Sequence, residues 1–172
     1  MTQYISSDTN IWIDFAIIDA IHIPFCLDCE YLMYRDSFES ELLSPPWLKE
    51  RLINLGIRCI DIELIEFDLS EQISEKYRQK HLSAEDCVAL AIAKNRKITL
   101  MTGDKHLREA AECENVKVIG TIGVLDWVLR EGHISTVEYV RSLTSLRDNP
   151  VRRLPREALE SRIRKYSSGV KS

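Results

Sequence analysis

Short runs of apolar and β-branched residues alternate along the chain with longer stretches whose apolar positions recur at helical spacing. The short runs predict strands at residues 3–7, 30–34, 57–63, 97–102 and 116–119. The longer stretches predict helices at residues 11–21, 37–43, 47–55, 67–80, 87–94, 105–113, 121–130, 136–146 and 156–166. Strands that alternate with helices favour a parallel sheet with helices on both faces. The pattern predicts an α/β protein with three α/β/α layers, a central parallel sheet of about five strands and a C-terminal helical extension.

Residues that start and stop helices mark several boundaries of these elements. Asp8 and the two residues after it are N-cap types that precede the first helix. Ser83, followed three positions later by Asp86, has the pattern of a capping box. Gly56 is placed to end the third helix.

The composition is that of a globular protein with one core. The chain has 172 residues, of which 45% are hydrophobic and 29% are charged, a size and balance typical of one domain. No apolar run approaches the roughly 20 residues that cross a bilayer, and the first residues lack the basic and apolar regions of a signal peptide. Five cysteines are an odd number, which argues against a disulfide framework. We therefore expect a cytoplasmic protein that has no membrane partner.

The charge is divided unevenly between the body of the chain and its tail. Residues 1–150 carry 16 Lys and Arg against 25 Asp and Glu, whereas residues 151–172 carry 7 against 2. The basic tail can bind RNA phosphates, because an acidic body needs basic surface to hold a polyanion. Its apolar positions also recur at helical spacing, so one face can instead pack on the body or on a second subunit. The sequence leaves both roles open.

Acidic residues follow several of the predicted strands, and they are the main candidates for chemistry. Asp8 follows the first strand, Asp104 follows the fourth, and Asp86 lies in the first turn of the helix before that strand. Glu39 and Glu41, after the second strand, are candidates for a fourth acid. In an open parallel sheet, ligands bind at the carboxyl ends of the strands, near the point where the strand order reverses. We therefore expect these acids to meet at one edge.

Carboxylates gathered at one edge repel one another and raise at least one pKa unless a cation lies between them. Such groups typically bind hard metal ions, and we expect Mg²⁺ or Mn²⁺ here. Two ions roughly 3.5–4 Å apart can activate a water and stabilise the leaving oxygen of a phosphodiester, as in many nucleases. Asp8, Asp86 and Asp104 also have a purely structural explanation, because Asp at a helix N-terminus caps the helix and complements its dipole.

Four segments in this order resemble the acidic motifs of PIN-domain ribonucleases. They are Asp8-Thr-Asn10, Ser37-Phe-Glu-Ser-Glu-Leu42, Glu85-Asp86-Cys-Val-Ala-Leu-Ala-Ile-Ala93 and Leu100-Met-Thr-Gly-Asp104. The resemblance covers residues 3 to about 130. It implies a PIN-like nuclease domain over residues 1–132, with residues 133–172 as a helical extension that ends in the basic tail and packs on the same domain.

The resemblance also implies a set of site residues and an activity. The implied metal ligands for Mg²⁺ or Mn²⁺ are Asp8, Glu41, Asp86 and Asp104. Asn10 and Thr102 would orient ligands or water. Glu41 is preferred to Glu39 because the family's acid directly precedes an aliphatic residue, here Leu42. Proteins of this family hydrolyse RNA phosphodiester bonds, often as the toxin of a toxin–antitoxin pair.

Other interpretations stay open at this stage. Asp14 lies one helical turn after Asn10, so it either shares the face of the site or is a solvated acid. A phosphotransfer or receiver-like protein has a similar sheet and could use Lys105, but it needs a second Asp where this chain has Asn10. A non-catalytic PIN-like interaction module is the other alternative. The partners we expect are an RNA substrate, an antitoxin protein and a second copy of the chain in a homodimer.

Overall fold

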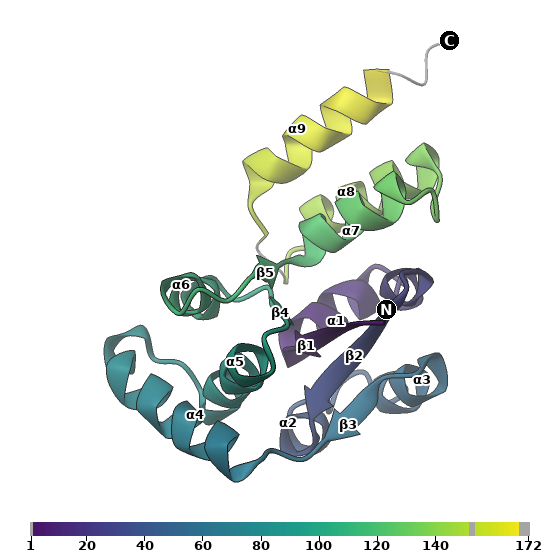
Figure 1. Ribbon diagram of the computed structural model, residues 1–172. Helices are drawn as coiled ribbons and strands as arrows, with labels where there is room; N and C mark the ends of the chain where they lie inside the picture. The colour runs from purple at the N-terminus through teal and green to yellow at the C-terminus, as the bar shows by residue number, and fades with distance from the viewer. Residues whose placement is uncertain (1, 152–153, 169–172) are drawn as a thin grey trace.

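The computed structural model describes residues 2–151 and 154–168, and within them five parallel strands form one central sheet (Figure 1). The strands are β1 (Gln3–Ser7), β2 (Cys29–Tyr34), β3 (Arg58–Ile60), β4 (Thr99–Met101) and β5 (Val118–Ile119). Their order across the sheet is β3-β2-β1-β4-β5, and every neighbouring pair is parallel. The order reverses between β1 and β4, so the carboxyl ends of these two strands mark the expected ligand crevice.

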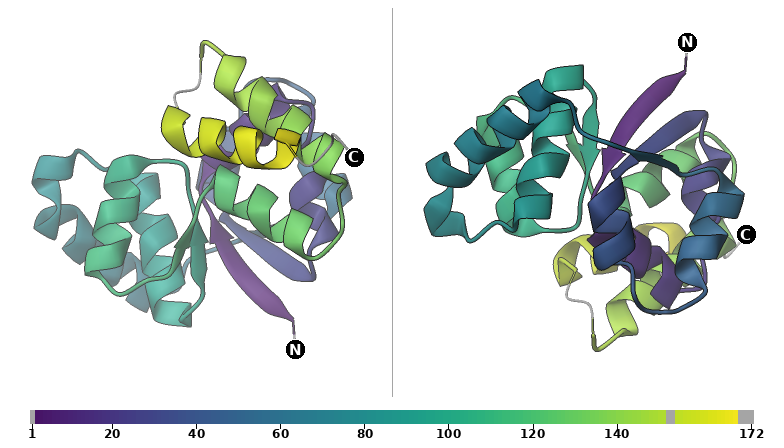
Figure 2. Two further views of the ribbon diagram at one scale, coloured as in Figure 1. Left: turned by 90° about the horizontal axis from the view of Figure 1, so that it is seen from above. Right: turned by 90° about the horizontal axis from the view of Figure 1, so that it is seen from below.

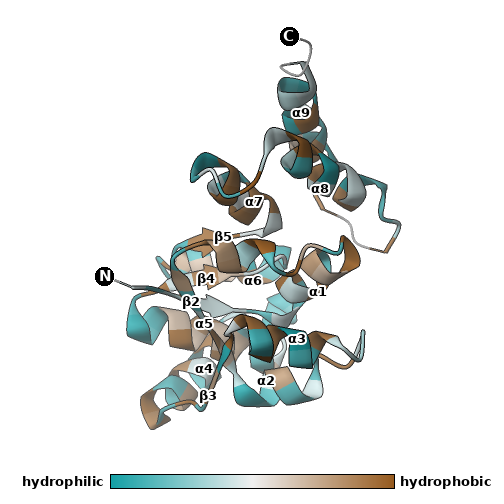
Figure 3. Cartoon of the chain, turned by 90° about the vertical axis from the view of Figure 1, so that its right-hand side faces the viewer, coloured by the Kyte–Doolittle hydropathy of each residue, from teal (hydrophilic) through white to brown (hydrophobic). Residues whose placement is uncertain are grey.

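Helices lie on both faces of this sheet (Figure 2). They are α1 (Thr9–Ile17), α2 (Arg35–Ser40), α3 (Leu48–Leu55), α4 (Leu64–Lys76), α5 (Ala84–Arg96), α6 (Lys105–Cys113), α7 (Thr121–Arg130), α8 (Thr136–Asp148) and α9 (Arg156–Ser167), with two short 3₁₀ helices, η1 (Ile23–Cys26) and η2 (Arg78–Lys80). One cluster of buried side chains joins α1, α3 and α7 to β1 and β2, and a second joins α4, α5 and α6 to β4. Hydrophilic and hydrophobic residues alternate along the helices, as in amphipathic helices that turn one face to a core (Figure 3). The predicted α/β/α fold class is confirmed.

The helix boundaries that depend on local signals lie where the sequence predicts them. The hydroxyl of Ser83 accepts a hydrogen bond from the N–H of Asp86 at 3.0 Å, and the Asp86 carboxylate accepts from the N–H of Ser83 at 2.9 Å. This is the predicted capping box at the start of α5. Gly56 ends α3 with a φ of 104°, in the left-handed region that favours glycine.

The first helix is shorter than its apolar run suggests. The sequence predicts a helix over residues 11–21, but α1 ends at Ile17. Asp19 adopts a left-handed φ of 53°, and the chain then enters η1. Ala20 and Ile21 are each 4% exposed although they lie outside any helix. The apolar run therefore marks burial, which a packed turn provides as well as a helix does.

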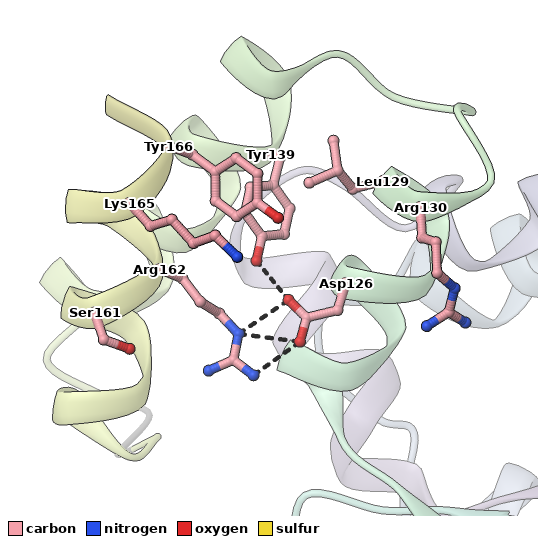
Figure 4. A pocket seen from close by; sticks show the side chains of 8 residues that line it. All are labelled: Asp126, Leu129, Arg130, Tyr139, Ser161, Arg162, Lys165 and Tyr166. Atoms are coloured by element: carbon pink, nitrogen blue, oxygen red, sulfur yellow. Dashed lines mark hydrogen bonds and ion pairs between the residues drawn. The ribbon is translucent and has the colours of Figure 1, made fainter. Parts of the chain in front are cut away.

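The C-terminal helix α9 packs against α7 and α8 (Figure 4). Its Leu159 is 1% exposed, and the ring of Tyr166 meets that of Tyr139 on α8 edge to face, with centroids 5.1 Å apart. Arg162 donates three hydrogen bonds of 2.8–3.0 Å to the carboxylate of Asp126 on α7. The hydroxyl of Tyr139 donates to the same carboxylate. The sequence leaves open whether the tail binds RNA or packs on the body. The contacts of α9 show that this part of the tail packs on the body.

Two arginines of the basic tail, Arg152 and Arg153, lie outside the described residues. An RNA contact by the tail therefore stays a prediction, and so does the domain boundary at residue 132. Among the helices that the structure describes, none is long and apolar enough to cross a membrane.

Candidate active site

Asp8 lies at the carboxyl end of β1, directly beside the end of β4. Its N–H donates to the carbonyl of Met101 at 2.9 Å, which extends the pairing of the two strands. Its Oδ1 caps α1 by accepting from the N–H of Thr9 at 2.7 Å, and its Oδ2 accepts from the hydroxyl of Thr102 at 2.9 Å. Because Asp8 is 6% exposed and Thr102 is fully buried, these bonds hold the carboxylate in one orientation.

Asp104 lies just past the end of the neighbouring strand and contacts the same threonine. The N–H of Asp104 donates to Oγ1 of Thr102 at 3.0 Å. The side chain of Asp104 caps α6 by accepting from the N–H of Leu107 at 2.8 Å. One hydroxyl therefore donates to Asp8 and accepts from Asp104. The structure thus brings together two of the acids that the sequence predicts at this edge.

Asp86 reaches the same edge from the first turn of α5. Burial raises the pKa of Asp86, and the negative charges of Asp104 and Glu85 raise it further, while the hydrogen bonds with Ser83 oppose the shift. The effect of Asp104 on this pKa shows that the two carboxylates lie within electrostatic reach of each other.

Glu41, at the end of α2, faces the start of α1. Its Oε2 accepts a hydrogen bond from the hydroxyl of Thr9, the residue that follows Asp8. Burial raises the pKa of Glu41, and the charges of Glu85 and Asp86 raise it further, whereas the bond from Thr9 lowers it. Glu41 therefore belongs to the same electrostatic group as the acids after β1 and β4.

Glu39, the alternative acid on the same helix, lies elsewhere. Its side chain is 66% exposed, and its carboxylate is 3.4 Å from Nζ of Lys49. The structure thus brings Glu41, and not Glu39, to the other carboxylates. A metal-binding role for Glu41 stays a prediction.

Asp8, Glu41, Asp86 and Asp104, hereafter the acidic group, repel one another. Burial raises the pKa of Asp8 to about 7, and the charges of Asp86 and Glu41 add to this rise, against the hydrogen bonds from Thr102 and Thr9. Within the part of the chain that the structure describes, no Lys, Arg or His forms an ion pair with any member of the group. A bound cation would relieve this repulsion.

Asp14 is a buried acid for which the sequence leaves two interpretations open, a place on the face of the site or exposure to solvent. Its side chain is fully buried, and its Oδ2 accepts from the hydroxyl of Thr121, the first residue of α7, at 2.7 Å. A Cβ at Gly103 would lie 3.3 Å from the same oxygen, so Asp14 borders the turn before Asp104. The interpretation of Asp14 as a solvated acid is therefore wrong, because α7 covers this face of α1.

Two other polar residues lie close to the acidic group. Asn10 is half-buried in the first turn of α1, and its role as a polar helper stays a prediction. Glu85 raises the pKa of both Asp86 and Glu41, so it lies near them. The sequence contains the adjacent acids Glu85 and Asp86, but their spacing does not predict that Glu85 also lies near Glu41.

The donor chemistry of the acidic group fits a hard divalent cation, because carboxylate oxygens are the ligands that Mg²⁺ and Mn²⁺ prefer. Among residues 2–151 and 154–168, however, no three His, Cys, Asp or Glu side chains are close enough together to hold an ion as they stand. Asp8, Asp86 and Asp104 instead use carboxylate oxygens to cap helices. The residues fit a metal in type and in charge, but as they stand they are not close enough together to hold one.

A parallel sheet between two layers of helices, with an acidic group where the strand order reverses, fits a nuclease-like domain. A family model described as a PIN domain matches residues 5–168, which includes α8 and α9, and the chain belongs to this family. PIN domains are generally nucleases that use divalent metals. Neither a search of curated proteins nor a search of solved structures gave a significant match.

Proposed function

We propose that this protein is a Mg²⁺- or Mn²⁺-dependent endoribonuclease that hydrolyses RNA phosphodiester bonds with metal-activated water. The observation that supports this most strongly is the acidic group at the carboxyl ends of β1 and β4, in which burial and mutual repulsion raise the pKa of Asp8, Glu41 and Asp86. Helix capping alone does not require acids to lie so close together that their charges raise one another's pKa, so this arrangement favours a bound cation. Family membership supports the nuclease class.

In this proposal the acidic group supplies the metal ligands and neighbouring hydroxyls fix their positions. A bound metal supplies an activated water and stabilises charge on the leaving oxygen. Thr102 orients the carboxylate of Asp8 by donating to it, and Thr9 does the same for Glu41. Asn10, beside Thr9 in the first turn of α1, would orient a ligand or the water.

One observation favours the alternative of a non-catalytic PIN-like interaction module. Three of the four acids already cap helices, and the described residues contain no group of three ligands in contact distance of one ion. A receiver-like phosphotransfer protein gains no such support. Residue 10 is Asn where that protein needs an acid, and Nζ of Lys105 lies 4.0 Å from the carboxylate of Glu109.

The test is cleavage of a labelled single-stranded RNA by the full chain in Mn²⁺, in Mg²⁺ and in EDTA. We expect cleavage with either metal, none in EDTA, and loss of cleavage in Asp8→Asn, because Asn can still cap α1 but is a poorer cation ligand. Circular dichroism checks that the variant is folded. A folded wild type that neither binds Mn²⁺ nor cleaves RNA would support the interaction module instead.

A toxin role with an antitoxin partner rests on the family resemblance alone. Growth arrest on expression of the wild type, relieved by Asp104→Asn, would support it. Normal growth with an active nuclease would contradict it. The proposed homodimer is tested by light scattering on the purified chain.

A further inference from the structure

A groove begins beside the acidic group and follows the start of α7. It has a volume of about 730 Å³ and lies between α6, α7 and α9, which converge near β5 (Figure 1). Gly103, the residue before Asp104, lines it, as do Gly120 and Gly123 in the first turn of α7. The residues on either side of Asp104 in the chain, Gly103 and Lys105, therefore place one end of the groove next to the acidic group.

The charge of this groove is opposite to that of the chain as a whole. Its described lining includes Lys105, Arg108 and Arg162, and no Asp or Glu. Arg162 is paired with Asp126, and Lys105 is exposed. Arg108 is half-buried and forms no ion pair with the residues that the structure describes. A half-buried guanidinium without a protein anion favours an anionic ligand.

Arg108 lies directly against the first turn of α7. A Cβ at Gly120 would be 2.5 Å from Nη2 of Arg108, so only a glycine leaves room for the guanidinium in this position. Gly120 is the N-cap of α7, and no side chain caps this helix. The guanidinium of Arg108 therefore lies against the start of α7, and a guanidinium binds phosphate oxygens well.

The lining of the groove also indicates which part of a nucleic acid it fits. Single-stranded bases typically stack on aromatic side chains. None of the described residues that line this groove is aromatic. The basic residues of the groove fit a backbone phosphate, and a contact to the backbone carries no sequence preference.

We propose that Arg108, held against the start of α7, binds a backbone phosphate of the RNA strand next to the bond that is cleaved. This inference rests on the proposed ribonuclease function. It assigns to Arg108 a substrate-positioning contact outside the acidic group.

The test compares RNA affinity of the full chain, Arg108→Gln and Arg51→Gln, measured by fluorescence anisotropy in EDTA with a short single-stranded RNA of mixed sequence. Arg51 is exposed on α3, the helix that leads into β3, and β3 is the edge strand opposite β5. Its replacement removes the same charge. We expect Arg108→Gln to weaken binding roughly tenfold at low salt. The slope of log K against log salt should flatten by about 0.7, the value for one phosphate contact on a single strand.

Gly120→Ala tests the geometry without a change in charge, because the new Cβ displaces the guanidinium of Arg108. We expect it to weaken RNA binding while Arg51→Gln does not. If wild type binds and cleaves RNA but Arg108→Gln behaves like Arg51→Gln, the inference is wrong and the proposed function stands. If the wild type neither binds nor cleaves RNA, both are wrong.

Discussion

The hydroxyl of Thr102 donates to the carboxylate of Asp8 across the boundary where the strand order reverses, at 2.9 Å. The same oxygen accepts the N–H of Asp104, so one buried hydroxyl links the two acids that end neighbouring strands. Their relative position is therefore set by the β1–β4 pairing and by this single side chain.

Replacing Thr102 with Val keeps the shape of the side chain but removes both hydrogen bonds. We expect a loss of about 1–3 kcal/mol in the free energy of unfolding, because the buried carboxylate of Asp8 and the half-buried N–H of Asp104 lose their partner. RNA cleavage should fall by roughly 10- to 100-fold, as for other residues that orient a metal ligand. Thr102→Ser retains the hydroxyl and should keep most of the stability and most of the cleavage activity. Equal cleavage by Thr102→Val and wild type would show that the orientation of Asp8 is unimportant for activity.

Glu39, in the last turn of α2, and Glu41, its C-cap residue, allow a matched comparison. Glu41→Gln should lower RNA cleavage by roughly 100-fold or more, because it removes a charge from the acidic group. Glu39→Gln should leave cleavage unchanged, because the Glu39 carboxylate is exposed and lies near Lys49. Initial rates at saturating Mn²⁺ measure both. The opposite result would make Glu39 the second acid.

The stability of the metal-free protein should depend on pH through Asp8. The pKa of Asp8 is raised from 3.8 to about 7, first by burial and then by the charge of Asp86. Between these values the folded state keeps a proton that the unfolded state has lost, so this group lowers the free energy of unfolding as pH rises. The loss is complete above the folded-state pKa.

Asp8→Asn removes this titration. Urea unfolding in EDTA should therefore show a stability gain of the variant over wild type that grows from about pH 4 to about pH 7 and then levels off. If the stability difference between Asp8→Asn and wild type stays constant from about pH 4 to about pH 7, Asp8 is ionised in the folded protein throughout this range.

The docking of α9 should contribute to the stability of the body. The side chain of Leu159 is 1% exposed between α9 and its neighbours, so Leu159→Ala leaves a cavity there. We expect the free energy of unfolding to fall by about 2–4 kcal/mol. Arg164→Ala, at an exposed position on the same helix, should change the free energy of unfolding by less than about 0.5 kcal/mol. Equal effects in urea unfolding would mean that α9 is not packed on the body in solution.

The sequence predicts the elements that depend on local signals better than those that depend on tertiary packing. Helices α6 and α7 have the predicted limits, and Asp104 caps α6 as its residue type suggests. The strand predicted over residues 97–102 shortens to Thr99–Met101, because Lys97 takes a left-handed φ of 55° to end α5. The spacing of apolar residues does not predict such a φ.

Within the site, residues that follow strands were predictable, whereas contacts between helices were not. Asp8 and Asp104 lie together because parallel neighbours end at one edge, which the βαβ pattern implies. The burial of Asp14 depends on α7 packing over α1, elements more than 100 residues apart in the chain. The bond from Thr9 to Glu41 depends in the same way on how α1 meets α2.

The most direct test of the proposed metal-dependent nuclease measures the melting temperature and the RNA cleavage of wild type, Asp104→Asn and the control Asp68→Asn. Asn at position 104 can still cap α6, so the variant should fold, and Asp68 is exposed on α4 away from the acidic group. A ligand that binds only the folded state stabilises it by RT ln(1 + [L]/Kd). Mn²⁺ should therefore raise the melting temperature of wild type and Asp68→Asn.

In Asp104→Asn the Mn²⁺ shift should shrink and RNA cleavage should fall by several orders of magnitude. An Asp104→Asn protein that melts at a lower temperature in EDTA, yet keeps both the full Mn²⁺ shift and cleavage, would show that Asp104 is only a helix cap, and it would contradict the assignment of the acidic group as a metal centre.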